Sequence, residues 1–263
     1  MVSVGQGVGH GAGRVAGVLA LAWLLIGPAA ATAQTDVQLW SNLTFDWAKS
    51  ARLVYELDVE PKVLVKKPEG EPGWRNVDLT PNVEYSPTGW FDLVGEATVG
   101  YTRQTDEVHS FEVSPRVGIR FHFLSRYVDA VVRNREMSPN RRLVVRDLMR
   151  VESRNLFYGG AGSGTDSSWR FRNRIEVLLP LNGPTLAGDR VLYALSDWEW
   201  FVPIDEPDER FANRHRVRAG FGYRRTASWR YEFLYMWTRS RNTIEDGFET
   251  SDNIIDFRVK RVF

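Results

Sequence analysis

The sequence contains no cysteine, so neither a disulfide nor a thiolate metal site can form. From residue 37 onward it also has no stretch with the 3.6-residue apolar spacing of an amphipathic helix. Lysine is scarce, with 5 lysines against 29 arginines, whereas ten residues are tryptophan. We therefore expect stability to come from hydrogen-bonded strands and packing.

The charge is balanced, with 34 Lys and Arg against 33 Asp and Glu. Nucleic-acid-binding proteins usually carry a basic excess, so this balance argues against a nucleic-acid partner. The acidic stretch at 205–209 is typical of a solvated turn, and no spacing of metal ligands is present. We expect neither a metal nor a cofactor.

The first 33 residues have the pattern of a cleaved secretory signal peptide. Arg14 is their only charged residue, an apolar segment follows from Val15 to Ile26, and small residues lead to Ala33. The apolar segment is shorter than the about 20 residues that a membrane-spanning helix needs. We expect an exported chain, residues 34–263, with a single domain.

Polar and apolar residues alternate from residue 37 to the end, which predicts β-strands. In the last strand Ile255, Phe257 and Val259 share one face, and Asp256 and Arg258 share the other. The predicted strands cover 37–47, 52–65, 77–85, 91–101, 111–123, 142–157, 168–181, 190–202, 211–225, 228–241 and 251–263.

These strands are long, with one face rich in aromatic residues and the other rich in charge. Both features favour a transmembrane β-barrel, whose strands cross the bilayer in about 9–11 residues and must close into a ring. We predict an all-β fold, a single antiparallel up-and-down barrel of about twelve strands. The twelfth would lie around Tyr127–Arg133, and ten strands is the alternative.

The barrel assignment places the charged faces in the lumen, with acidic residues from the first strands opposite arginines from the later ones. If the walls touch, the lumen becomes an ionic network; if they stand apart, water fills it. The predicted basic lining comprises Arg150, Arg154, Arg170, Arg172, Arg174, Arg214, Arg216 and Arg218. The predicted acidic lining comprises Glu56, Asp58, Glu60, Glu84, Asp92, Glu96, Glu112, Glu152 and Glu176.

The C-terminal segment resembles the signal by which bacterial outer-membrane barrels are recognised for assembly. It ends on Phe263, with Val259 and Phe257 on the same face, although Arg261 departs from the usual apolar residue. The resemblance implies the barrel assembly machinery as a partner, together with outer-membrane lipid and lipopolysaccharide. We also expect the last strand to pair with the first.

Five blocks together resemble an uncharacterised bacterial outer-membrane family, domain of unknown function 2490. The resemblance implies a barrel in the outer membrane of a Gram-negative bacterium, and it carries no ligand or reaction. The blocks are "QLWSNLTFDW", "EPGWRNVDLTPNVEYSPTGWFDLVGEATVGYTRQ", "SWRFRNRIEVLLPLN", "DEPDERFANRHRVRAGFGYRR" and "TRSRNTIEDGF".

Three functions are open. The first is a narrow channel or transporter for small polar or anionic solutes, whose identity the sequence does not give. The second is a plugged structural or partner-binding barrel, and the third is a lipid-acting hydrolase. His109 and Ser110 are adjacent and so point to opposite faces of a strand, and His122 and His215 have no Ser–acid pair in sequence. We therefore predict no catalytic residues.

Overall fold

The computed structural model describes residues 35–50, 52–67, 73–104, 108–123, 143–160, 163–205, 213–241 and 250–263. Within these ranges no helix is long and apolar enough to cross a membrane. The secondary structure consists of β1 (Thr35–Ala48), β2 (Leu53–Lys66), β3 (Trp74–Tyr85), β4 (Phe91–Gln104), β5 (His109–His122), β6 (Val144–Gly159), β7 (Gly164–Pro180), β8 (Val191–Pro203), β9 (Asn213–Thr226), β10 (Trp229–Arg241) and β11 (Thr250–Val262).

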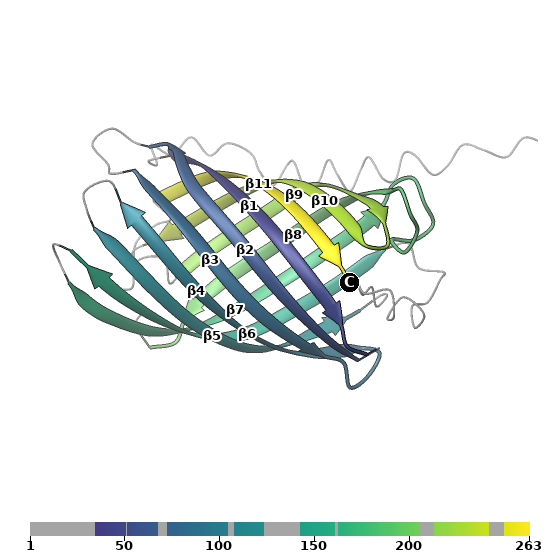
Figure 1. The fold of residues 1–263 in the computed structure, drawn as a ribbon, viewed down its shortest axis with the longest axis horizontal. Helices are drawn as coiled ribbons and strands as arrows, with labels where there is room; N and C mark the ends of the chain where they lie inside the picture. The colour runs from purple at the N-terminus through teal and green to yellow at the C-terminus, as the bar shows by residue number, and fades with distance from the viewer. Residues whose placement is uncertain are drawn as a thin grey trace, which may run out of the picture. The chain divides into compact units, whose positions relative to one another are not determined.

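The strands form one closed barrel in which each pairs with its neighbours in sequence and β11 returns to β1 (Figure 1). This confirms the predicted all-β barrel and the pairing of the last strand with the first. Ten of the pairs are antiparallel. The closing pair is parallel, from Thr35 beside Ser251 to Asp46 beside Val262.

The ring formed by the described residues has eleven strands, between the expected twelve and the alternative ten. The even counts followed the even strand number of bacterial single-chain outer-membrane barrels. With an odd number of alternating strands, the first and last run in the same direction, which makes the closing pair parallel. β5 and β6 pair directly with each other, and the segment Tyr127–Arg133 lies outside the described residues.

Apolar and charged side chains are distributed over the two faces of the strands in the opposite way to that found in soluble proteins. On the outer face Phe233 is 57% exposed and Phe257 is 43% exposed, whereas inward Asp256 is 0% exposed. Soluble proteins bury such apolar side chains and expose the charged ones. The barrel therefore presents an apolar outer surface and encloses its charges.

An apolar cluster fills part of the barrel at the rim where β11 ends, here called the C-terminal rim. The turn at 181–190 inserts Leu186 between inward side chains, and Arg224 Nη1 donates to its carbonyl oxygen at 3.0 Å. This Leu186 cluster comprises Val144, Leu178, Leu186, Tyr193, Leu195 and Leu234.

Gly222 makes room for the ring of Tyr193 in the Leu186 cluster. A Cβ at this position would lie 2.1 Å from Tyr193 Cζ, closer than any tolerated contact. Tyr193 is fixed at its far end, because its hydroxyl donates to Glu232 Oε1 at 2.6 Å. The close packing at this rim thus depends on a residue without a side chain.

We predict that Gly222→Val lowers the free energy of unfolding by about 1–3 kcal/mol, the usual cost of overpacking. Denaturant unfolding of the barrel in lipid vesicles measures it. The matched control is Gly95→Val, because a Cβ at Gly95 meets nothing within 4 Å. Equal stability of the two variants would contradict the packing described here.

Candidate functional site

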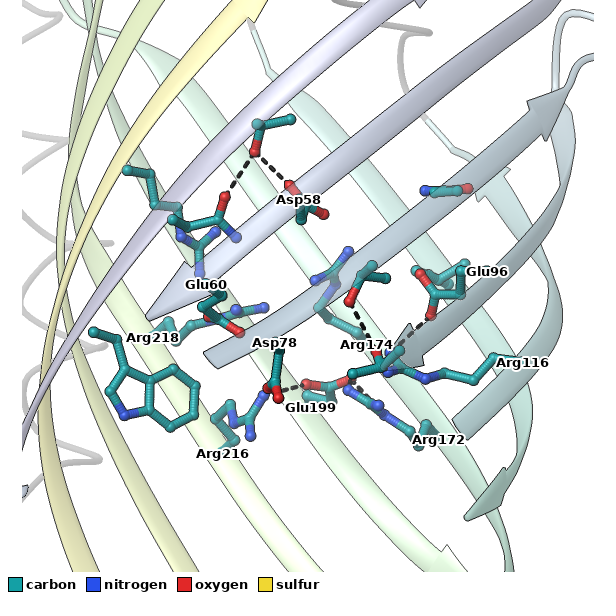
Figure 2. A pocket seen from close by; sticks show the side chains of 18 of the residues that line it. Asp58, Glu60, Asp78, Glu96, Arg116, Arg172, Arg174, Glu199, Arg216 and Arg218 are labelled. Atoms are coloured by element: carbon teal, nitrogen blue, oxygen red, sulfur yellow. Dashed lines mark hydrogen bonds and ion pairs between the residues drawn. The ribbon is translucent and has the colours of Figure 1, made fainter. Parts of the chain in front are cut away.

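The barrel encloses a cavity of ≈ 870 Å³ lined by side chains from all eleven strands (Figure 2). Fifteen basic and fourteen acidic residues line it. Their distribution is uneven, because β1 to β5 contribute nine acidic and three basic residues, whereas β6 to β9 contribute nine arginines and three glutamates. An acidic wall therefore lies on one side of the ring and an arginine-rich wall on the other.

Glu199 of β8 is the most heavily engaged carboxylate. Arg150 Nη2 and Arg172 Nη2 donate to its Oε1 at 2.6 and 2.9 Å, and Arg216 Nη1 donates to its Oε2 at 3.2 Å. The side chain is fully buried. One carboxylate thus balances guanidinium groups from three strands, and charge-assisted bonds of this kind are the strong ones.

Two further glutamates extend these contacts around the ring. Arg172 Nη1 donates to both oxygens of Glu152 at 3.3 Å, and Arg150 Nη1 donates to Glu96 Oε1 at 2.5 Å. Arg150 therefore links Glu96 of β4 to Glu199 of β8. We call the whole set the central ion network: Glu96, Glu152, Glu199, Arg116, Arg150, Arg170, Arg172 and Arg216.

Lysines pair with part of the acidic wall. Lys62 Nζ lies 2.5 Å from Asp78 Oδ2 and 3.0 Å from Glu60 Oε2. Lys260 Nζ of β11 lies 2.7 Å from Glu56 Oε2 and also contacts β1. These pairs hold the carboxylates of β2 and β3 against the wall.

Three aromatic residues, Trp40, Trp74 and Phe201, line the lumen among the charges. The guanidinium of Arg216 lies 5.5 Å from the ring of Trp40 and 5.3 Å from the ring of Phe201. Lys62 Nζ also lies over the Trp40 ring, 4.3 Å from its centroid. Because Trp40 is on β1 and Arg216 on β9, with two strands between them in the ring, the walls meet here through a cation–π contact.

The lumen therefore combines the two arrangements left open by the sequence: its walls touch at Trp40, yet a cavity remains. All the predicted basic residues line that cavity, namely Arg150, Arg154, Arg170, Arg172, Arg174, Arg214, Arg216 and Arg218. So do eight predicted acidic residues, Glu56, Asp58, Glu60, Glu84, Glu96, Glu112, Glu152 and Glu176. Sequence reasoning missed Trp40, Trp74 and Phe201, although each has the strand parity of the charged face.

Asp92 is the predicted acidic residue that does not line the cavity. It is buried near the C-terminal rim, where its Oδ2 lies 2.6 Å from Nε2 of His122. His122 lies on the neighbouring strand, and the contact is a tertiary one that alternation alone does not show. Asp92 and His122 form a buried pair at the wall, away from the space a solute could enter.

The three described histidines lie in different places on the barrel wall. His122 Nδ1 has no hydrogen-bond partner within the described residues. His109 and His215 lie on the outer face, with ring centroids 6.1 Å from Tyr101 and 6.2 Å from Trp198. No group of three metal-ligating side chains occurs in the part of the chain that the structure describes.

The C-terminal residues proposed as an assembly signal lie on the outer surface. Phe263 stacks on Trp47 with ring centroids 5.5 Å apart, and its backbone N–H donates to Asp46 O at 2.9 Å. Phe257 and Val259 share the outer face of β11. Their recognition by the assembly machinery stays a prediction.

Comparison with known proteins identifies the family. The family model described as "Protein of unknown function (DUF2490)" matches residues 37–249. Among solved structures, LpxR from Salmonella typhimurium is similar, with a TM-score of 0.52 and 6% sequence identity, over 84% of this chain and 87% of that chain. No curated protein matches. The likeness to LpxR shows the barrel fold.

We predict that Glu199→Gln lowers the free energy of unfolding by about 3–5 kcal/mol, because it removes the buried carboxylate that Arg150, Arg172 and Arg216 share. Denaturant unfolding in lipid vesicles measures the change.

Glu112→Gln is the matched control, since that side chain is 27% exposed and its pair with Arg154 spans 3.3 Å. Its expected cost is about 1 kcal/mol or less. Adding Arg216→Gln to Glu199→Gln should restore part of the stability. If Glu199→Gln cost no more than Glu112→Gln, the central ion network would not stabilise the barrel.

Proposed function

The chain belongs to the family of proteins of unknown function DUF2490, and on that premise we propose that it is an integral outer-membrane β-barrel whose lumen passes small polar or anionic solutes. The observation that supports this is the polar cavity of ≈ 870 Å³ that every strand of the barrel lines. A barrel with a purely structural role has no need of such a space along its axis.

The outer surface supports a membrane location. Apolar side chains cover it, and Trp47, Trp90 and Trp229 are exposed together at the C-terminal rim. Amphipathic indole rings concentrate at the headgroup level of bilayers. We place this rim at one interface of the membrane, with outer-membrane lipid and lipopolysaccharide around the barrel.

Export and assembly complete the proposal. Residues 1–33, outside the described part of the chain, act as a cleaved signal peptide that carries the protein across the inner membrane of a Gram-negative bacterium. The apolar face that ends in Phe263 then serves the barrel assembly machinery. Both steps follow from the sequence patterns and from the position of Phe263 on the outer face.

The dimensions of the lumen limit the size of the solute. Barrels of about 8 strands fill with side chains, whereas those of 16–18 strands leave a wide aqueous channel. Eleven strands and a cavity of ≈ 870 Å³ correspond to one small molecule at a time. The acidic and arginine-rich walls set up a transverse field that orients such a solute.

A plugged barrel is the second candidate, and two observations favour it. The Arg216–Trp40 contact joins β9 to β1 across part of the lumen, and the Leu186 cluster occupies part of the C-terminal rim. In this case the loops at the rims would present the working surface. Conductance separates the two candidates.

We predict discrete current steps from the mature protein in planar bilayers. Arg174→Glu and Arg216→Glu should each move the reversal potential toward cation selectivity, because each places a negative charge on the arginine-rich wall. Measurement in a salt gradient gives the ratio of anion to cation permeability.

Arg225→Glu is the matched control: it makes the same change of charge on an exposed residue of the outer face, so selectivity should stay as in the wild type. A complete absence of current, with the barrel correctly inserted, would reject the channel in favour of the plugged barrel.

A further inference from the structure

Arg174 is an exception among the lumenal arginines. It lines the cavity, yet among the described residues it makes no hydrogen bond and has no carboxylate within 4 Å. Its cross-strand neighbour Glu199 pairs with three other arginines, and Glu176 of its own strand pairs with Arg146. A guanidinium stays charged at any physiological pH. Glu176, Glu199 and Asp197 act on this charge from a distance, so it faces the cavity without a carboxylate in direct contact.

Arg218 of β9 adds a second unfilled donor. It is 5% exposed, and its Nε donates to both oxygens of Asp197 at 2.8 Å. Its Nη2 is buried and has no hydrogen-bond partner within the described structure. A buried donor without a partner is rare in native proteins, and each instance calls for a specific explanation.

The strand register brings these two side chains to one patch of the wall. Arg174 lies opposite Glu199 on β8, and Arg218 lies opposite Asp197, two residues away on the same strand. The like charge of Arg218 is the charge that acts most strongly on Arg174. Both side chains line the cavity, and both are labelled in Figure 2.

We propose that Arg174 and Arg218 form a binding site for the oxyanion group, carboxylate or phosphate, of a small solute. This inference deepens the proposed function, on which it rests, by naming a point in the lumen where an anionic solute binds. The guanidinium fork matches the spacing of two carboxylate or phosphate oxygens. Such a ligand would meet the unfilled donor of Arg218 and the unpaired charge of Arg174 at once.

The charge around the site favours an anion. On β6 to β9 nine arginines and three glutamates line the cavity, and those glutamates are already engaged by arginines. A cation would meet net repulsion there, whereas an anion would reduce the excess positive charge. Water alone could satisfy the donors but would not balance the charge of Arg174.

Isothermal titration of inorganic phosphate and, separately, of succinate into the purified full-length mature barrel in detergent tests the proposal. The wild type should show one saturable site for at least one of the two probes, and the probe that binds identifies the favoured oxyanion. Arg174→Gln should weaken binding at least tenfold. Its fold is checked by thermal unfolding, where we expect stability equal to or above that of the wild type, because no ion pair is lost.

Two comparison variants separate local binding from the general field of the lumen. Arg154→Gln also removes one positive charge from the arginine-rich wall, but this arginine is already paired with Glu112. The affinity for the probe should therefore fall less than threefold. Arg225→Gln on the outer face should leave affinity unchanged. If Arg174→Gln binds as tightly as the wild type, or if neither probe binds to the wild type, the site is occupied by water and the proposal is overturned.

The titration and the bilayer recording are independent. Saturable binding that Arg174→Gln abolishes, without any current, keeps the site and rejects the channel. Current without saturable binding keeps the channel and rejects the binding site.

Discussion

A charge enclosed by the barrel must have an opposite charge within reach, and the interior of the barrel is organised around this requirement. Burying an unpaired ion costs several kcal/mol, so fifteen basic and fourteen acidic side chains share one cavity. Glu199 and Glu152 are fully buried and each contacts three arginines. A similar requirement applies to the backbone. In lipid no strand edge can stay unpaired, and closing the ring meets this requirement.

The uneven distribution of these charges links the architecture to the proposed function. If acidic and basic residues alternated evenly around the ring, each would pair with a neighbour, and no electric field would cross the lumen. Here the acidic residues concentrate on β1 to β5 and the arginines on β6 to β9. Pairing between the walls is therefore incomplete, and Arg174 is where the arginine-rich wall keeps a charge available to a solute.

Alternation along each strand was enough to predict most of the fold. In β10, Phe233 and Tyr235 face outward while Glu232 and Leu234 face inward, as the period of two requires. The cavity-lining role of the arginines on β7 and β9 follows from the same rule.

The features that sequence missed depend on the closed ring. Trp40 lies on the charged face of β1, but its contact with Arg216, 176 positions later in the chain, arises only because the ring closes. The parallel closure of β1 on β11 depends on the total number of strands, which no local pattern encodes. Asp92 has the correct parity, yet it pairs with His122 of the next strand and does not line the cavity.

The central claim is that the aromatic face of each strand meets acyl chains while the charged face encloses the lumen. Because the chain has no cysteine, single cysteines can carry spin labels at residues 230–237 of β10 in lipid vesicles. Labels replacing Tyr231, Phe233 and Tyr235 should collide mainly with oxygen dissolved in the bilayer, and labels at the positions between them should not, giving a period of two. A uniform response along the strand, or lipid contact at Glu232 and Leu234 instead, would contradict the account.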